Sequence, residues 1–135
     1  MSIVEGHVIV LSLPFANGNP CTYKRPFLVI EKTNSILKLL NISSIKGKEH
    51  KLLFPSNVII REYNPPLDYP SFLKLDELYV IDYFDELIRA IYKRRPPLNT
   101  NEFNRLLDRF SNYKNSNNVA EVKYIETMVK QLNFT

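Results

Sequence analysis

The chain has 135 residues, of which 18 are Lys or Arg and 14 are Asp or Glu, and its formal net charge is +4. This length suits one domain with a proper core, and 44% hydrophobic residues with eight Tyr and eight Phe exclude a disordered tail. No run approaches the roughly eighteen apolar residues of a membrane span, and Met1–Val4 carries no basic segment of the signal-peptide type. We therefore expect a cytoplasmic protein, and the positive charge favours an anionic partner such as nucleic acid.

Several kinds of catalytic and metal site are disfavoured by residue counts. Cys21 is the single cysteine, so neither an intrachain disulfide nor a cysteine-based zinc site is expected. His7 and His50 have no Cys or Ser–Asp partners nearby in the sequence, and three glycines cannot form a Gly-rich phosphate loop. The acids at 82–86 fall where a helix begins, a position that suits negative charge. We expect no metal and no cofactor.

The first part of the chain predicts five to seven short strands separated by Pro- and Gly-rich turns. The expected strands are Gly6–Leu13, Phe27–Glu31, Leu37–Ile42, Leu52–Phe54, Asn57–Glu62, Ser71–Lys74 and Leu78–Ile81. Short strands with this punctuation favour a small antiparallel barrel over a parallel α/β sheet. Between them, Ile45–Lys51 is polar and should be a mobile loop.

The chain then changes its apolar period from that of strands to that of helices. Phe84, Leu87, Ile88 and Ile91 recur at helical spacing and predict a helix that ends at the basic cluster 93–95. This cluster either balances the helix dipole or binds a partner. Asn99 and Glu102 resemble a capping box that opens a second helix with Phe103, Leu106, Leu107 and Phe110 on its apolar face. A last helix is expected from Val119 to about Leu132, so that 1–135 forms one α+β domain.

Polar residues gather at the ends of the expected strands. Lys24 and Arg25 precede Pro26 at the mouth of one strand, and Ser43 and Ser44 follow another. If residues 74–76 are part of a strand, Leu75 should point into the core, and Lys74 and Asp76 should share the opposite face. Two interpretations of that pair stay open, a phosphate-stabilising acid–base pair and an ordinary salt bridge.

Lysines in the polar loop at 45–51 offer a second source of positive charge. Lys46, Lys48 and Lys51 surround Gly47. Such a loop can bind a phosphate backbone without recognising the base sequence, or it can simply be a solvated lysine-rich loop.

The order of these motifs resembles the MazF/PemK (Kid) family, the toxins of type II toxin–antitoxin systems. The resemblance covers about Gly6–Phe110 and rests on the first strand, Arg25-Pro26, Ile42-Ser43-Ser44 and the run Lys74-Leu75-Asp76-Glu77-Leu78. It implies a small SH3-like antiparallel β-barrel with C-terminal helices, here with the helix at 119–132 as an addition. It also implies a homodimer, a cognate antitoxin, and cleavage of single-stranded RNA without metal.

The resemblance also implies roles for individual residues. Arg25 matches the family's loop arginine, Ser43 stands where a threonine is usual, Lys74 stands where some members have arginine, and Asp76 matches the family's aspartate. In this scheme the RNA 2′-OH attacks the adjacent phosphate, giving a 2′,3′-cyclic phosphate and a 5′-OH. Asp76 is the candidate base, Arg25 the stabiliser and candidate acid, Lys74 a second stabiliser and Ser43 a positioning group. The expected substrate-binding residues are Lys24, Ser44, Lys46, Lys48 and Lys51.

One segment departs from the family pattern. Many members carry a glutamate or glutamine and a glycine just before the Arg-Pro pair, where this chain has Cys21-Thr22-Tyr23-Lys24. The alternative function is therefore a weak or inactive barrel module that binds RNA or protein, or a gyrase poison of the CcdB type, since fold does not fix function.

Overall fold

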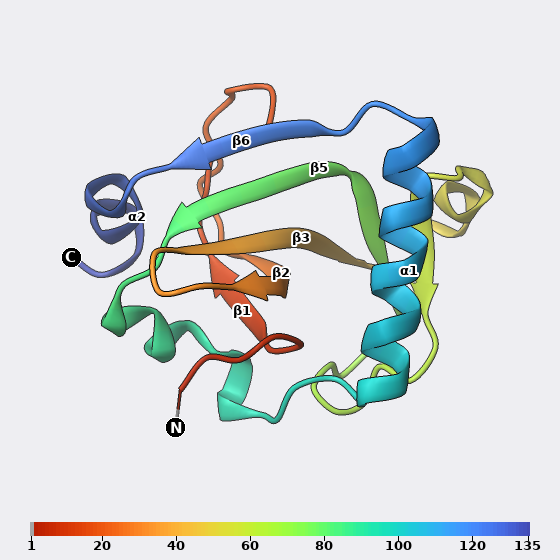
Figure 1. Cartoon of the computed structure of the whole chain (residues 1–135), viewed down its shortest axis with the longest axis horizontal. Helices are drawn as coiled ribbons and strands as arrows, with labels where there is room; N and C mark the ends of the chain where they lie inside the picture. The colour runs from red at the N-terminus through yellow and green to blue at the C-terminus, as the bar shows by residue number, and fades with distance from the viewer. Residues whose placement is uncertain (1) are drawn as a thin grey trace.

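The computed structural model describes residues 2–135 and shows an α+β fold, in which a six-stranded mixed sheet is combined with helices in the C-terminal part of the chain (Figure 1). The strands are β1 (Val8–Leu11), β2 (Arg25–Lys32), β3 (Ile36–Ser44), β4 (Asn57–Ile60), β5 (Ser71–Asp82) and β6 (Ala120–Tyr124). Their order is β1-β2-β3-β5-β4, and β6 pairs with β5. All pairs are antiparallel except β5 with β6.

Strand β5 organises the sheet because it changes partners along its length. Its first half pairs with β4, and its second half, from Glu77 to Ile81, pairs with β6. The two short strands predicted at 71–74 and 78–81 are thus one strand. Its pairing with β3 is irregular in the middle, where Lys74–Glu77 lies opposite Asn41 without regular partners in β3. This bulge bends β5 and turns its side chains.

The sheet is not closed into a barrel, so the prediction of an SH3-like antiparallel barrel is wrong in that respect. Strand β1 pairs with β2 and otherwise makes an isolated bridge between Ile9 and Ile91, while β4 ends the sheet at the other side. The parallel β5–β6 pair is the other departure. The α+β class and the C-terminal helices are confirmed.

Two expected elements are short 3₁₀ helices instead. The predicted helix around Phe84–Ile91 is η2 (Asp85–Ala90), followed by η3 (Tyr92–Arg94). The predicted strand at 52–54 falls largely in η1 (Glu49–Leu53), so the lysine loop ends in a helical turn. Apolar spacing alone did not distinguish these tight turns from regular elements.

Helix α1 (Thr100–Ser116) confirms the predicted second helix and its N-cap. The Asn99 side-chain oxygen accepts hydrogen bonds from the backbone N–H groups of Asn101 and Glu102. Glu102 does not complete a capping box, because its carboxylate turns inward, accepts from the backbone N–H of Arg61 at 2.6 Å and pairs with Arg105. This contact fixes α1 against β4.

The expected C-terminal helix at 119–132 is only half present. Residues 120–124 form β6, and α2 (Glu126–Asn133) follows. Partners distant in sequence explain the difference, since β5 offers an open edge to β6 and the Asp82 carboxylate accepts the Glu126 N–H at 2.8 Å where α2 begins.

Two hydrophobic clusters cover the two faces of the sheet, as the alternation along β1 and β2 requires. Val8 and Leu28 belong to the cluster under α1, and Ile9 and Phe27 belong to the cluster that includes η2 and Val129 of α2. Within residues 2–135 the helices are too short or too polar to cross a membrane.

Candidate functional site

A cavity of about 370 Å³ opens where β2, β3 and β5 meet the loop after β3. It brings together every residue predicted for the site except Lys46 and Asp76. Its lining consists of Phe15, Tyr23, Lys24, Arg25, Pro26, Asn41, Ile42, Ser43, Ser44, Lys48, Lys51, Phe72 and Lys74. The lining thus carries five cationic side chains and no carboxylate, a combination suited to an anion.

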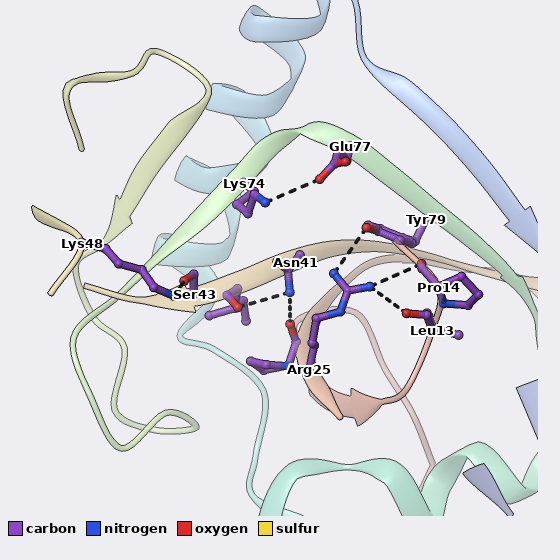
Figure 2. A network of polar contacts seen from close by, with 11 residues as sticks. Leu13, Pro14, Arg25, Asn41, Ser43, Lys48, Lys74, Glu77 and Tyr79 are labelled. Atoms are coloured by element: carbon purple, nitrogen blue, oxygen red, sulfur yellow. Dashed lines mark hydrogen bonds and ion pairs between the residues drawn. The ribbon is translucent and has the colours of Figure 1, made fainter. Parts of the chain in front are cut away.

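Arg25 forms the inner wall of the cavity instead of standing free at a strand mouth (Figure 2). It is the first residue of β2 and is only 6% exposed. Its Nη2 donates to the carbonyl oxygen of Leu13 at 2.9 Å, and its Nη1 lies 3.4 Å from the Tyr79 hydroxyl. The guanidinium also lies 4.4 Å from the centre of the Phe15 ring. Its charge is therefore held by carbonyls and aromatic rings: both terminal nitrogens have partners, whereas the buried Nε has none among the described residues.

Ser43 and Lys48 are joined across the open side of the cavity. The Lys48 ammonium donates to the Ser43 hydroxyl over 3.0 Å (Figure 2). Deeper inside, the Asn41 amide donates to the carbonyl oxygen of Pro26 over 3.0 Å and so holds β2 and β3 together at the cavity floor. Ser43 thereby orients a lysine of the loop predicted to be mobile, a role the sequence did not reveal.

Lys74 pairs with Glu77, a residue that sequence reasoning did not select for the site. Lys74 Nζ lies 3.5 Å from Glu77 Oε1, and both side chains are about one-third exposed (Figure 2). Glu77 also acts electrostatically on this side of the sheet. Burial is the main reason that the pKa of Tyr124 is raised; the positive charge of Arg25 opposes the rise, and the negative charge of Glu77 adds to it.

Asp76 and Lys46 lie outside the cavity lining. The Asp76 Oδ1 atom is buried and accepts no hydrogen bond among the described residues. The bulge in β5 explains the separation, because it breaks the alternation that would have placed Lys74 and Asp76 on one face. Leu75 is buried, as predicted. Lys46 instead lines a neighbouring hollow with Tyr69 and Pro70.

Several lining residues were not predicted from the sequence. Phe15 and Tyr23 come from the loop between β1 and β2. The length of this loop was the one feature of the sequence that could have indicated binding residues there. The Phe15 and Tyr23 rings lie edge to face, 6.4 Å apart. Asn41 of β3 and Phe72 of β5 also line the cavity, and nothing in their local sequence marks them.

Two further polar side chains, those of His7 and Cys21, have structural partners. His7 is buried and its Nδ1 accepts the backbone N–H of Val4 at 2.9 Å, and burial lowers its pKa. The Cys21 thiol donates to the carbonyl oxygen of Tyr23. Within residues 2–135, no group of His, Cys, Asp and Glu side chains is placed to hold a metal ion.

The chemistry available is therefore that of a cationic, hydroxyl-bearing cavity with an ion pair at its rim. Comparison with known proteins adds no identity to this description, since neither a model of a known protein family nor a curated protein sequence matches the chain.

Proposed function

We propose that the protein is an endoribonuclease that cleaves single-stranded RNA at this cavity by attack of a ribose 2′-OH on the adjacent phosphate. The observation that carries the proposal is the lining itself, which gathers Lys24, Lys48, Lys51 and Lys74 around Arg25 with no carboxylate among them. Four ammonium groups around a buried guanidinium match a phosphate backbone by charge.

The phosphate would bind between the lysine loop and β5. Lys48 is oriented by Ser43, and Lys74 is oriented by Glu77, so two ammonium groups are placed before a ligand arrives. Orientation in advance favours stabilisation of the phosphorane charge that develops in the transition state. Arg25 adds positive charge from the cavity wall. Because it is hydrogen-bonded to protein atoms, we assign it a structural role and not a direct contact with the reacting phosphate.

The proton transfers are assigned to the pair at the rim. In this scheme Glu77 takes the proton of the 2′-OH as the oxygen attacks phosphorus, and the Lys74 ammonium protonates the departing 5′ oxygen. The P–O2′ bond forms and the P–O5′ bond breaks, which leaves a 2′,3′-cyclic phosphate and a 5′-OH. DNA lacks the attacking group and should not be cut.

This assignment moves the base from Asp76, the position that the family resemblance suggests, to its neighbour. Neither carboxylate lines the cavity, but Glu77 forms an ion pair with the lining residue Lys74, and Asp76 does not. Because both are carboxylates in the same bulge, Asp76→Asn is the matched control for Glu77→Gln.

The test is incubation of the purified protein with a long single-stranded RNA in EDTA, alongside a DNA of the same sequence. We expect discrete RNA fragments with cyclic-phosphate ends and intact DNA. RNA that stays intact at high protein concentration would contradict the proposal.

A second candidate function is a module that binds RNA without cutting it. The Arg25 hydrogen bonds and the Lys74–Glu77 pair favour it, because they leave these groups engaged with protein atoms. In that case RNA would bind but stay intact, and Glu77→Gln would change neither result.

We also propose the biological setting that the resemblance suggests, a toxin that acts as a homodimer and is held inactive by an antitoxin. The cationic lining supports an inhibitor that presents carboxylates to the cavity. Co-expression with an acidic protein encoded nearby, followed by a cleavage assay of the complex, tests this setting.

A further inference from the structure

We propose that a nucleobase next to the bound phosphate enters a separate apolar slot and stacks on Tyr69. This inference rests on the proposed function, because it assigns a base-binding subsite to the same RNA. The slot has a volume of about 190 Å³ and lies between β2, β3 and the segment before β5. That volume is below the ~300 to 1,000 Å³ of sites for drug-sized ligands, so it suits a single ring system.

The slot adjoins the cationic cavity and shares a wall with it. Pro26, Ile42 and Ser44 line both spaces. A ligand chain whose phosphate lies in the cavity would therefore have its next group at the slot. The remaining walls are largely apolar, with Val10 and Leu67 among them, and apolar walls suit the flat faces of a base more than another phosphate.

Tyr69 is the exposed aromatic side chain at this slot. It is 69% exposed, and it lines both the slot and the adjoining hollow that contains Lys46. An exposed aromatic ring beside a cationic cavity is the arrangement with which proteins bind single-stranded nucleic acids, because every base offers a face for stacking.

The backbone around Tyr69 is held firmly although its ring is exposed. The Ser71 hydroxyl donates to the Tyr69 carbonyl oxygen over 2.8 Å, and the Ile45 N–H donates to the Pro70 carbonyl oxygen over 3.0 Å. On the other side, Asp68 accepts hydrogen bonds from Tyr92, Lys93 and Arg95. The segment that carries the ring is therefore already ordered, so that binding a base does not require this backbone to become ordered first.

The charge at Asp68 does not oppose a phosphate nearby. Its carboxylate forms ion pairs with both Lys93 and Arg95. The acidic residue on the slot is thus balanced by two cations, and RNA can approach the slot without net repulsion from it.

The experiment uses a 2′-O-methyl hexanucleotide, which cannot be cleaved by 2′-OH attack, and measures its affinity by fluorescence anisotropy. Each base in turn is replaced by an abasic unit, and the wild-type chain is compared with Tyr69→Ala, Tyr69→Phe and Ile125→Ala. Ile125 is the matched control because it is also well exposed, at 57%, and lines none of the cavities described here.

We expect Tyr69→Ala to weaken binding between about fivefold and about a hundredfold, the range that one stacked base supplies. Tyr69→Phe and Ile125→Ala should bind like the wild type. For one position of the oligonucleotide, the abasic replacement should weaken binding to the wild type by a similar factor. With that abasic oligonucleotide, Tyr69→Ala should bind as well as the wild type, because the ring and the missing base form a single contact.

If the affinity of Tyr69→Ala for the complete oligonucleotide were within about twofold of the wild-type affinity, the proposal of a base-binding slot would be wrong. If Lys51→Ala still weakened binding in that case, the proposed RNA site would stand without the slot. An effect of Tyr69→Ala that persists with every abasic oligonucleotide would also overturn the stacking contact, because the ring would then act on something other than a base.

Discussion

Lys74 and Glu77 form an ion pair, with 3.5 Å between Nζ and Oε1, inside the bulge of β5 at the rim of the cationic cavity. The bulge places a proton donor and a proton acceptor side by side, although their spacing along a regular strand would send them to opposite faces. This pair is the feature on which the proposed chemistry depends.

Neutralising Glu77 should slow RNA cleavage more than neutralising its neighbour. We expect Glu77→Gln to reduce the single-turnover rate by about a hundredfold or more, the usual contribution of a general base, whereas Asp76→Asn should cut at a rate near that of the wild type. Oligonucleotide affinity should change little in either variant. The opposite order of the two rates would return the role of base to Asp76.

Replacing Arg25 should damage the fold as well as the site. Arg25→Met removes the donors to the Leu13 carbonyl and the Tyr79 hydroxyl inside the protein, and we expect a loss of about 2 to 4 kcal/mol in the free energy of unfolding. Urea denaturation measures this loss. Lys74→Met, at a partly exposed side chain, serves as the comparison and should change stability by less than about 1 kcal/mol. Equal stability of wild type and Arg25→Met would show that Arg25 is not structural.

The contact between α1 and β4 should weaken in acid. The hydrogen bond from Arg105 lowers the pKa of Glu102, with a further contribution from the Arg61 N–H, although burial works in the opposite direction. A carboxyl group with a lowered pKa in the folded state adds stability above its unfolded pKa, and this stability is lost as pH falls through the folded value.

The free energy of unfolding should therefore decrease as pH falls below the ordinary glutamate value of 4.5. Glu102→Gln should be less stable than the wild type at neutral pH, and the difference should narrow in acid. Urea titrations at several pH values measure the free energy of unfolding of the wild type and of Glu102→Gln. A difference between the two that stays constant with pH would contradict the assignment of this pH dependence to Glu102.

Oligonucleotide binding should depend on salt in proportion to the lysines that contact phosphate. For single strands the slope of log K against log salt is roughly −0.7 for each phosphate neutralised. Lys51→Ala should make the slope shallower by about that amount, and Ser43→Ala should act in the same direction through the orientation of Lys48. A slope unchanged in Lys51→Ala would remove that lysine from the interface.

Much of the site was predictable from the sequence because strand ends are marked locally. Apolar runs bounded by Pro and polar residues located β2 and β3, and Arg25, Ser43 and Lys74 do line one cavity. The N-cap at Asn99 was equally visible, since capping depends on residues close in sequence.

What the sequence did not reveal depends on partners far along the chain. Residues 120–124 form a strand because β5 offers an edge, and periodicity cannot detect a parallel pairing over that separation. The bulge at 74–77 likewise depends on Asn41 of β3, so the sequence placed Asp76 beside Lys74 and overlooked Glu77. The inward turn of Arg25 required the carbonyl groups of a loop whose path was unknown.

The most direct test of the proposal that RNA is cleaved at this cavity compares two lysines that differ chiefly in location. Lys74 and Lys38 each pair with a glutamate, at 3.5 and 3.7 Å, and their side chains are 32% and 34% exposed, but only Lys74 lines the cavity. Single-turnover cleavage of RNA in EDTA should fall at least about a hundredfold in Lys74→Met and stay near the wild-type rate in Lys38→Met. Equal rates for the two variants would contradict the assignment of cleavage to this cavity.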